Sequence, residues 1–518
     1  MCHNADTSYT KPYHIRTRKI PTMLLPRCSG VLLHPTALPG PHGIGSVGAE
    51  AQAFVDFLVT AGQCLWQVLP LGPTGLGDSP YNALSAFAGN PLLIDLPTLV
   101  AWADLDPVDL EEEPPADGSV DFSAVHRFKE SRLVRAAANF LARADRQRRD
   151  ELARFCAAQS DWLDDYALFV ALRNHFQGSS WQQWPAPLRL RDPATLAAWR
   201  GQLAGAIALE QYRQYCFFTQ WAALKEYANQ QGIRLFGDLP IFVALDSADV
   251  WTHQHLFRLD PEGHPTVVAG VPPDYFSATG QLWGNPLYCW QAHVADGFAW
   301  WRQRLQAELQ RADLVRIDHF RGLESCWAIP APATTAVNGQ WDKSPGADLC
   351  RALLTVAPEL PIVAEDLGVI TPEVDALRRE FGLPGMKILQ FAFDSGPANP
   401  YLPHNYDSSC VVYTGTHDNA TTRGWWESLT VTQRARIGAY LGKRHPEIPW
   451  DLIRLAMASV AGLCIIPCQD LLGLGDAARF NRPGIGIGNW RWRLAPDQLT
   501  NDIAEQLRSL TETYNRCC

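Results

Sequence analysis

The sequence lacks the features that would place the chain in a membrane, on nucleic acid or in a secretion pathway. Its longest apolar stretch, residues 455–468, is too short to cross a bilayer and contains Pro467. A formal net charge of −10 argues against binding to nucleic acid or to an anionic membrane surface. No signal peptide is recognisable. We therefore expect neither a nucleic-acid partner nor a membrane partner.

Motifs for several kinds of catalysis are also absent. There is no GxxxxGK[ST] loop for nucleotide phosphates and no GxSxG turn for acyl transfer. The glycine-rich run at 484–489 follows a loop rather than a strand, which argues against a dinucleotide site. His34, His319 and His417 are scattered over different predicted strands, without HxH or HExxH spacing. We therefore expect no catalytic metal and no cofactor.

The cysteines give no sign of a zinc site. The chain has 13 of them and no CxxC pair, and the terminal Cys517 and Cys518 are simply adjacent. We interpret all of them as reduced thiols, which are typical of a reducing compartment and favour a cytoplasmic location. Residues 1–25 are predicted to form a disordered extension. The alternative is a plastid location, with the polar and basic residues 1–22 as part of a transit peptide.

Eight short runs rich in Val, Ile and Leu predict strands that are buried on both faces. They are residues 30–38, 64–71, 233–242, 314–320, 361–367, 387–391, 410–416 and 463–472. Helical patterns lie between many of them, at 48–61, 210–231, 294–311, 371–381 and 428–442. Strands that alternate with helices eight times predict an α/β fold of the (β/α)8, or TIM-barrel, class with large inserted subdomains.

Two connections are too long to be simple barrel loops. Between the second and third strands we predict a helical insertion over about residues 98–205. Between the third and fourth strands we predict a loop-rich insertion over about residues 243–292. Long segments with little secondary structure are usually functional. The predicted organisation is a single catalytic barrel domain, residues 26–518, that carries both insertions.

Acidic residues end three of the predicted strands. They are Asp318 in LVRIDHF, Glu365 in PIVAEDLG and Asp418 in VVYTGTHDN. Barrel enzymes place their catalytic groups at this carboxyl end of the strands. Two or three carboxylates that converge there are what the cleavage of a glycosidic bond requires. Asp238 and His34 occupy similar strand ends, and a purely structural barrel would not need polar residues at so many of them.

The neighbours of each acid suggest a role for it. Arg316 shares a strand face with Asp318, and a nearby guanidinium keeps a carboxylate ionised, as a nucleophile requires. An apolar surround and the adjacent Asp366 predict a raised pKa for Glu365, which suits a general acid. A third carboxylate, Asp418, can stabilise oxocarbenium-like charge. For each acid taken alone, a structural ion pair or a turn residue is the alternative.

At this point the motifs resemble those of a known family. RIDHFRGL (316–323), VAEDLG (363–368) and TGTHDN (414–419) are similar to the motifs of the amylomaltases, which are 4-α-glucanotransferases, or disproportionating enzymes, related to the α-amylases. Further matches are residues 29–45, 69–91, 237–251, 270–286 and 483–493. The resemblance extends from about residue 26 to the C-terminus.

The resemblance implies roles for particular residues. Asp318 corresponds to the nucleophile, Glu365 to the acid/base and Asp418 to the transition-state stabiliser. The substrate-binding residues that it implies are Tyr81, Asp238, Asp274, Tyr275, Gln281, Trp283, Arg316, Asp394 and His417. Residues 270–283 correspond to a mobile loop over the acceptor side. No metal is implied in catalysis.

The resemblance also implies a reaction, which the residues alone leave open. The implied reaction transfers a segment of an α-1,4-glucan to the 4-OH of glucose or a maltodextrin by retaining double displacement, in maltodextrin, starch or glycogen metabolism. Transfer and hydrolysis use the same three carboxylates, and a lid that excludes water favours transfer. Gly270 and Gly280 could be the hinges of such a lid. An α-glucan hydrolase and a non-catalytic glucan-binding protein are the alternatives.

Overall fold

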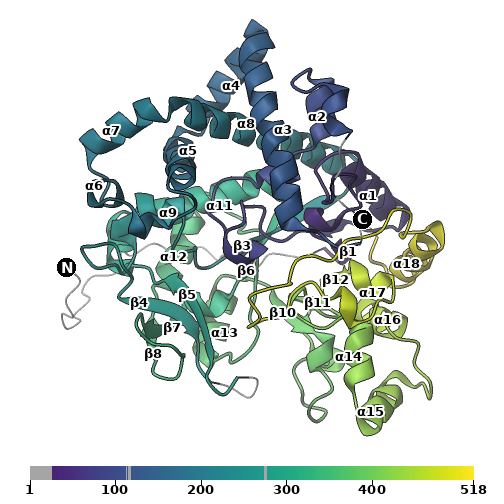
Figure 1. The fold of residues 1–518 in the computed structure, drawn as a ribbon. Helices are drawn as coiled ribbons and strands as arrows, with labels where there is room; N and C mark the ends of the chain where they lie inside the picture. The colour runs from purple at the N-terminus through teal and green to yellow at the C-terminus, as the bar shows by residue number, and fades with distance from the viewer. Residues whose placement is uncertain (1–25, 112–113, 115–117, 274–276, 518) are drawn as a thin grey trace.

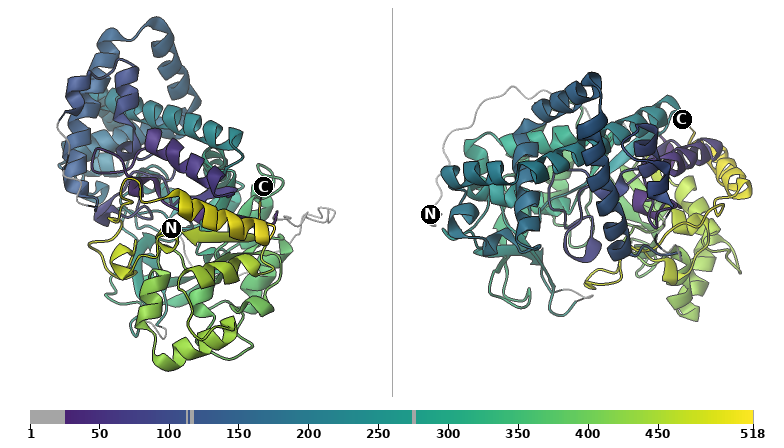
Figure 2. Two further views of the ribbon diagram at one scale, coloured as in Figure 1. Left: turned by 90° about the vertical axis from the view of Figure 1, so that its right-hand side faces the viewer. Right: turned by 45° about the horizontal axis from the view of Figure 1, so that its top comes forward.

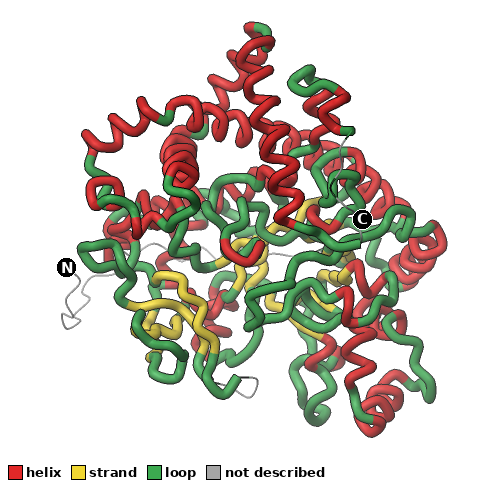
Figure 3. The backbone as a smooth tube through the Cα atoms, viewed as in Figure 1, coloured by secondary structure: helices red, strands yellow, loops and turns green. Residues whose placement is uncertain are grey.

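The computed structural model describes residues 26–111, 114, 118–273 and 277–517. The predicted extension, residues 1–25, lies outside the described residues, and so do Asp274 and Tyr275. Figure 1 and Figure 2 show a central sheet with helices around it and a smaller sheet at one side. Coloured by secondary structure, the strands gather at the centre and the helices lie outside (Figure 3).

Eight parallel strands form the centre of the molecule. In spatial order they are β10 (Gly385–Ile388), β11 (Cys410–Tyr413), β12 (Leu463–Pro467), β1 (Cys28–Leu32), β2 (Leu65–Gln67), β3 (Arg234–Pro240), β6 (Leu314–Asp318) and β9 (Ile362–Ala364). The two ends of this order meet where the Ala364 N–H donates to the Pro384 carbonyl at 2.8 Å. The sheet thus closes into a TIM-type (β/α)8 barrel, and all eight predicted strands are confirmed.

The strands are apolar because both of their faces are covered. Every residue of β1, β2, β9, β11 and β12 is buried. Gly30 in β1 shows how closely the strands approach, since a Cβ there would lie 2.3 Å from the Leu65 carbonyl oxygen of β2. This close packing fixes the positions of the strand ends, and therefore the positions of the residues that directly follow the strands.

Helices cover the outside of the barrel. Those associated with the barrel strands are α1 (Ala49–Thr60), α10 (Trp290–Ala295), α11 (Ala299–Arg311), α12 (Gly346–Leu353), α13 (Pro372–Glu380), α14 (Thr422–Ser428), α15 (Val431–Leu441), α16 (Trp450–Ala458), α17 (Cys468–Leu471) and α18 (Asn501–Thr513). The pattern at 294–311 predicted one helix, but the structure has a break between α10 and α11. Gly297 and Phe298 have positive φ angles of 66° and 58° there, which no continuous helix can contain.

The connection between β2 and β3 is helical, and it forms the upper part of Figure 1. Its helices are α2 (Leu96–Ala101), α3 (Phe122–Arg143), α4 (Arg146–Ala158), α5 (Ser160–His175), α6 (Ala186–Arg189), α7 (Pro193–Gln202) and α8 (Ala204–Gln230). Helix α8 packs on both α5 and β3. It therefore joins the inserted helices to the barrel.

A second sheet stands beside the barrel, and the sequence did not predict it. Its antiparallel order is β5 (Gln281–Pro286), β4 (Val267–Val271), β7 (Ser325–Pro330) and β8 (Gln340–Lys343). Two strands come from the segment interpreted as loop-rich, which also contains α9 (Ala248–Thr252). That segment is therefore more ordered than expected. The strands are short and partly exposed, so their sequences carry no clear apolar alternation.

Within the described residues, the cysteines differ from the expectation at one position. Cys64 is disulfide-bonded, whereas the other cysteines in the described ranges are free thiols. The interpretation of all 13 as reduced thiols is therefore wrong at Cys64. Spacing along a sequence cannot reveal a pairing that only the folded chain creates. Among the described residues, no helix combines the length and the apolar character that a bilayer span needs.

Candidate active site

The candidate site is built on the carboxyl ends of neighbouring barrel strands. Asp238 lies in β3, and Arg316 and Asp318 lie in β6. Glu365 directly follows β9, and Asp418 lies in the loop after β11. Because parallel strands end at the same edge of a barrel, these side chains meet at one mouth.

Arg316 connects two of the carboxylates. Its Nη1 donates to both oxygens of Asp238, at 2.9 and 2.7 Å, and its Nη2 donates to Asp318 Oδ1 at 2.7 Å. The Asp238 side chain is fully buried, whereas that of Asp318 is 29% exposed. Arg316 and Asp318 thus share a strand face, as their spacing predicted. The guanidinium holds one oxygen of Asp318 and leaves part of that carboxylate open.

Glu365 is held by backbone groups of two loops. Its Oε2 accepts from the His319 N–H at 2.7 Å, and its Oε1 accepts from the Leu367 N–H at 3.0 Å. His319 directly follows Asp318 in the chain, so the first of these bonds ties the loop after β6 to the loop after β9. The positions of the two acids relative to each other are therefore fixed by main-chain geometry.

Burial raises the pKa of Glu365 to about 8, and the negative charge of Asp318 acts in the same direction against the pull of Arg316. A raised pKa was predicted, but the second acid is Asp318 and not the adjacent Asp366. Asp366 turns away and accepts from the Met386 N–H at 2.7 Å. Glu365 is accordingly a carboxyl group that keeps its proton near neutral pH, as a general acid must.

Tyr81 closes the site opposite Arg316. Its hydroxyl donates to Asp238 Oδ2 at 2.7 Å, and its ring stacks on His417 with centroids 5.1 Å apart. Trp490 lies against both rings, at 6.0 and 5.9 Å. Burial lowers the pKa of His417, which favours a neutral imidazole. Four predicted substrate-binding residues, Tyr81, Asp238, Arg316 and His417, are thus brought together.

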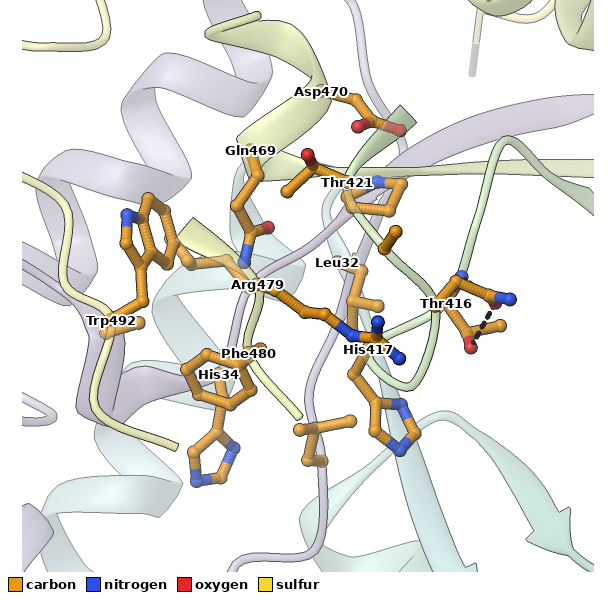
Figure 4. Close-up of a pocket in the computed structure, with 16 residues that line it drawn as sticks. Leu32, His34, Thr416, His417, Thr421, Gln469, Asp470, Arg479, Phe480 and Trp492 are labelled. Carbon is orange, nitrogen blue, oxygen red and sulfur yellow. Dashed lines mark hydrogen bonds between the residues drawn. The ribbon is translucent and has the colours of Figure 1, made fainter. Parts of the chain in front are cut away.

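Asp418 lies on the same side as His417. Its side chain is 43% exposed, and its Oδ1 lies 3.3 Å from His417 Nε2. The same oxygen accepts from Asn481 Nδ2 at 2.5 Å. A pocket adjoins this corner, and its lining includes His34 and Arg479 (Figure 4). Asp418 is therefore oriented by neighbours and remains open to a ligand.

Two other predicted residues lie on β5. Trp283 is 38% exposed and meets the ring of His319 edge to face, with centroids 4.8 Å apart. Its Nε1 donates to Gln281 Oε1 at 3.1 Å. Because the His319 N–H also donates to Glu365, this strand borders the side of the site where Glu365 lies.

Asp394 is exposed and lies in the loop after β10. Its Oδ1 accepts from Asn399 Nδ2 at 2.8 Å. Burial raises the pKa of Tyr401 to about 12, and the charges of Asp366, Glu365 and Asp394 contribute to that rise. Asp394 is more exposed than Asp318 and Glu365, so it lies nearer the surface than they do.

Sequence reasoning missed two residues that contact Asp418. Asn481 binds its carboxylate, and Arg479 Nη2 donates to its backbone carbonyl at 2.6 Å. Both lie within four residues before the PGIGIGNWRWR motif at 483–493, which offered the nearest sequence signal. In the described ranges, no group of three or more His, Cys, Asp and Glu could hold a metal ion. What the site offers is carboxylate chemistry: a partly exposed acid paired with Arg316, a buried acid whose pKa is raised, and a third acid beside them.

The family model described as 4-alpha-glucanotransferase matches residues 33–500. The chain belongs to the 4-alpha-glucanotransferase family. It is 51% identical over 502 residues to the 4-alpha-glucanotransferase of Thermus thermophilus. That alignment covers 95% of this chain and 100% of the Thermus protein. The Synechocystis sp. 4-alpha-glucanotransferase is 51% identical over 499 residues, an alignment that covers 95% of this chain and 99% of that protein.

A solved structure agrees with this assignment. The amylomaltase from Streptococcus agalactiae in complex with acarbose superimposes with a TM-score of 0.92 at 39% identity, over 95% of this chain and 100% of that one. The predicted family, the barrel fold and the 4-alpha-glucanotransferase function in glucan metabolism are confirmed.

Proposed function

We propose that this 4-alpha-glucanotransferase transfers a segment of an α-1,4-glucan to the 4-OH of glucose or a maltodextrin by retaining double displacement. Asp318 is the nucleophile, Glu365 the acid/base and Asp418 the transition-state stabiliser. One observation carries the proposal: a carboxylate paired with Arg316 lies beside a carboxyl group whose pKa is raised to about 8. A carboxylate held by a guanidinium suits a nucleophile, and a neighbouring carboxyl group of raised pKa suits a general acid.

In the first step Glu365 gives its proton to the glycosidic oxygen while Asp318 attacks C1. The bond between C1 and that oxygen breaks, the reducing-end fragment leaves, and a covalent glycosyl-enzyme forms. In the second step an acceptor 4-OH attacks C1, the ester to Asp318 breaks, and Glu365 takes the hydroxyl proton. The two inversions retain the α configuration.

Substrate binding is assigned from the position of each side chain. We assign Tyr81, Asp238, Arg316 and His417 to the donor sugar that reacts. Gln281 and Trp283, together with Asp274 and Tyr275 outside the described residues, are assigned to the acceptor side, and Asp394 to an outer contact. The partners are α-1,4-glucans as donor and acceptor, and glucose as acceptor.

The catalytic domain comprises residues 26–518, with the helical and β4–β5 segments as its insertions. We propose a cytoplasmic location, with a plastid as the alternative if residues 1–22 belong to a transit peptide. Transfer is favoured over hydrolysis because Trp283 offers an aromatic face beside the acid/base, where an acceptor sugar can displace water.

The experiment incubates the purified protein with maltotriose and resolves the products by chain length, with Asp318→Asn as the inactive variant. The matched control is Asp342→Asn, because Asp342 is also a 28% exposed carboxylate bound to an arginine, Arg258 at 2.5 Å. Glucose plus a ladder of longer maltodextrins, absent only in Asp318→Asn, is the expected result. Glucose and maltose without longer products would indicate a hydrolase. No turnover by the wild type would indicate a binding protein.

A further inference from the structure

The loop that carries His417 and Asp418 is anchored at both of its ends. The buried Asp470 accepts from Thr414 Oγ1 at 2.5 Å, and from the Thr422 N–H and hydroxyl at 2.8 and 2.6 Å. These bonds hold the ends of the loop. They do not fix the tip of the loop, which carries the Asp418 carboxylate.

The tip of this loop, at His417 and Asp418, is hydrogen-bonded by residues 479–481 from the C-terminal part of the chain. The Asn481 N–H donates to the His417 carbonyl at 3.1 Å, and its side-chain amide donates to Asp418 Oδ1 at 2.5 Å. Arg479 donates from Nη2 to the Asp418 carbonyl at 2.6 Å and from Nε to the Asn481 carbonyl at 2.8 Å. Arg479 therefore holds the residue that bears the carboxylate and also the residue that orients that carboxylate.

The side chain of Arg479 points toward the loop that carries His417 and Asp418. It extends across the pocket described above, and its guanidinium ends beside His417 (Figure 4). The Asp418 side chain is 43% exposed, so without these bonds its carboxylate could turn among several rotamers. A catalytic group has to be held within a fraction of an ångström of its productive position.

We propose that Arg479 is a positioning residue of the transfer reaction, which acts through the backbone carbonyls of Asp418 and Asn481 to fix the orientation of the Asp418 carboxylate. The proposal rests on the proposed role of Asp418. The alternative is that Arg479 only stabilises the fold of its loop. The two differ in one respect: a positioning residue loses its effect once the group that it positions has been removed.

The test is a double-mutant cycle on maltotriose disproportionation, followed by glucose release. Arg479→Met is measured in the wild type and in Asp418→Asn, and Arg479→Lys is measured as the conservative variant. The control is Arg482→Met, because Arg482 lies in the same loop but binds Asp476, at 3.0 Å. Thermal unfolding is recorded for each variant.

In the wild type, Arg479→Met is expected to lower kcat roughly 10- to 100-fold with a smaller change in KM, and Arg479→Lys to recover part of the loss. In Asp418→Asn the same substitution should change kcat less than about threefold. The effect of Arg482→Met should be the same in both backgrounds. An equal loss from Arg479→Met in both backgrounds would overturn the proposal.

Asn481→Ser provides the second variant if Arg479→Met does not fold, and the same non-additivity with Asp418→Asn is expected of it. Full additivity there would likewise contradict the proposal. Failure of the proposed function gives a different result, since Asp418→Asn alone would then keep wild-type activity.

Discussion

The backbone N–H of His319 donates a hydrogen bond of 2.7 Å to the carboxylate of Glu365. His319 has a left-handed conformation, with φ and ψ both 50°, which is uncommon for a residue with a side chain. His319 directly follows the proposed nucleophile, Asp318, and its N–H binds the proposed acid/base, Glu365. The spacing of the two acids thus depends on a main-chain contact rather than on flexible side chains.

The pKa of Glu365 predicts an alkaline limit to activity. Glu365 must be protonated to expel the leaving fragment, so kcat/KM should fall as the pH rises through about 8. The measurement is the pH profile of kcat/KM with maltotriose. α-Maltosyl fluoride is the control, because fluoride leaves without needing a proton from the enzyme. An alkaline limb that is the same for both donors would contradict the assignment of Glu365.

The same group predicts how stability depends on pH. The folded state keeps the Glu365 proton to about pH 8, whereas an unfolded glutamate loses it near pH 4.5. Between these values Glu365 binds fewer protons in the unfolded state, so its contribution to the stability of the wild type falls as the pH rises, by about 1.4 kcal/mol per pH unit at most.

Glu365→Gln removes this dependence. The difference between its Tm and that of the wild type should therefore increase from pH 5 to pH 8. A constant difference in Tm at all pH values would not affect this trend. Thermal unfolding at several pH values measures the difference. If the two proteins keep a constant difference in Tm over that range, the pKa of Glu365 is not raised.

Tyr81→Phe removes the hydroxyl that donates to Asp238 at 2.7 Å. A hydrogen bond to a charged group contributes about 1.5–3 kcal/mol, so kcat/KM should fall roughly 10- to 100-fold. Tyr212→Phe is the matched control, because Tyr212 donates to Asp104 at 2.8 Å and Asp104 also pairs with an arginine. That variant should lose stability and keep its kcat/KM. Equal losses of activity in both would refute the role of Tyr81.

Trp283→Ala should shift the reaction toward hydrolysis. The loss of an aromatic contact of about 0.5–1.5 kcal/mol should raise the ratio of hydrolysis to transfer roughly two- to tenfold. Reducing ends report this ratio, because transfer conserves their number and hydrolysis increases it. Trp341→Ala is the control, since Trp341 is 40% exposed on the same sheet and packs against Arg321. An unchanged ratio in Trp283→Ala would exclude an acceptor role.

The barrel could be predicted from the sequence because each of its strands is a short apolar run that packs on both faces. Asp318, Glu365 and Arg316 were found for the same reason, since a strand end fixes where its next side chain points. The small sheet was missed because a polar strand such as β8 depends on its partner, β7, for its structure.

The contacts of the site were harder to predict than its acids. Asn481 binds Asp418 across 63 positions of the chain. The acid that influences Glu365 is Asp318 on the neighbouring strand, and not the adjacent Asp366. Both relationships arise only when the barrel closes, and no local pattern encodes them.

The pairing of β1 with β12, in which Cys28 lies opposite Leu463, also has a consequence for synthesis. The first strand leaves the ribosome long before its neighbour exists. At about 5–20 residues per second, that wait lasts roughly 20 to 90 seconds. During that time the apolar edge of β1 has only β2 beside it, so the nascent chain must be shielded from aggregation until its last strands have been made.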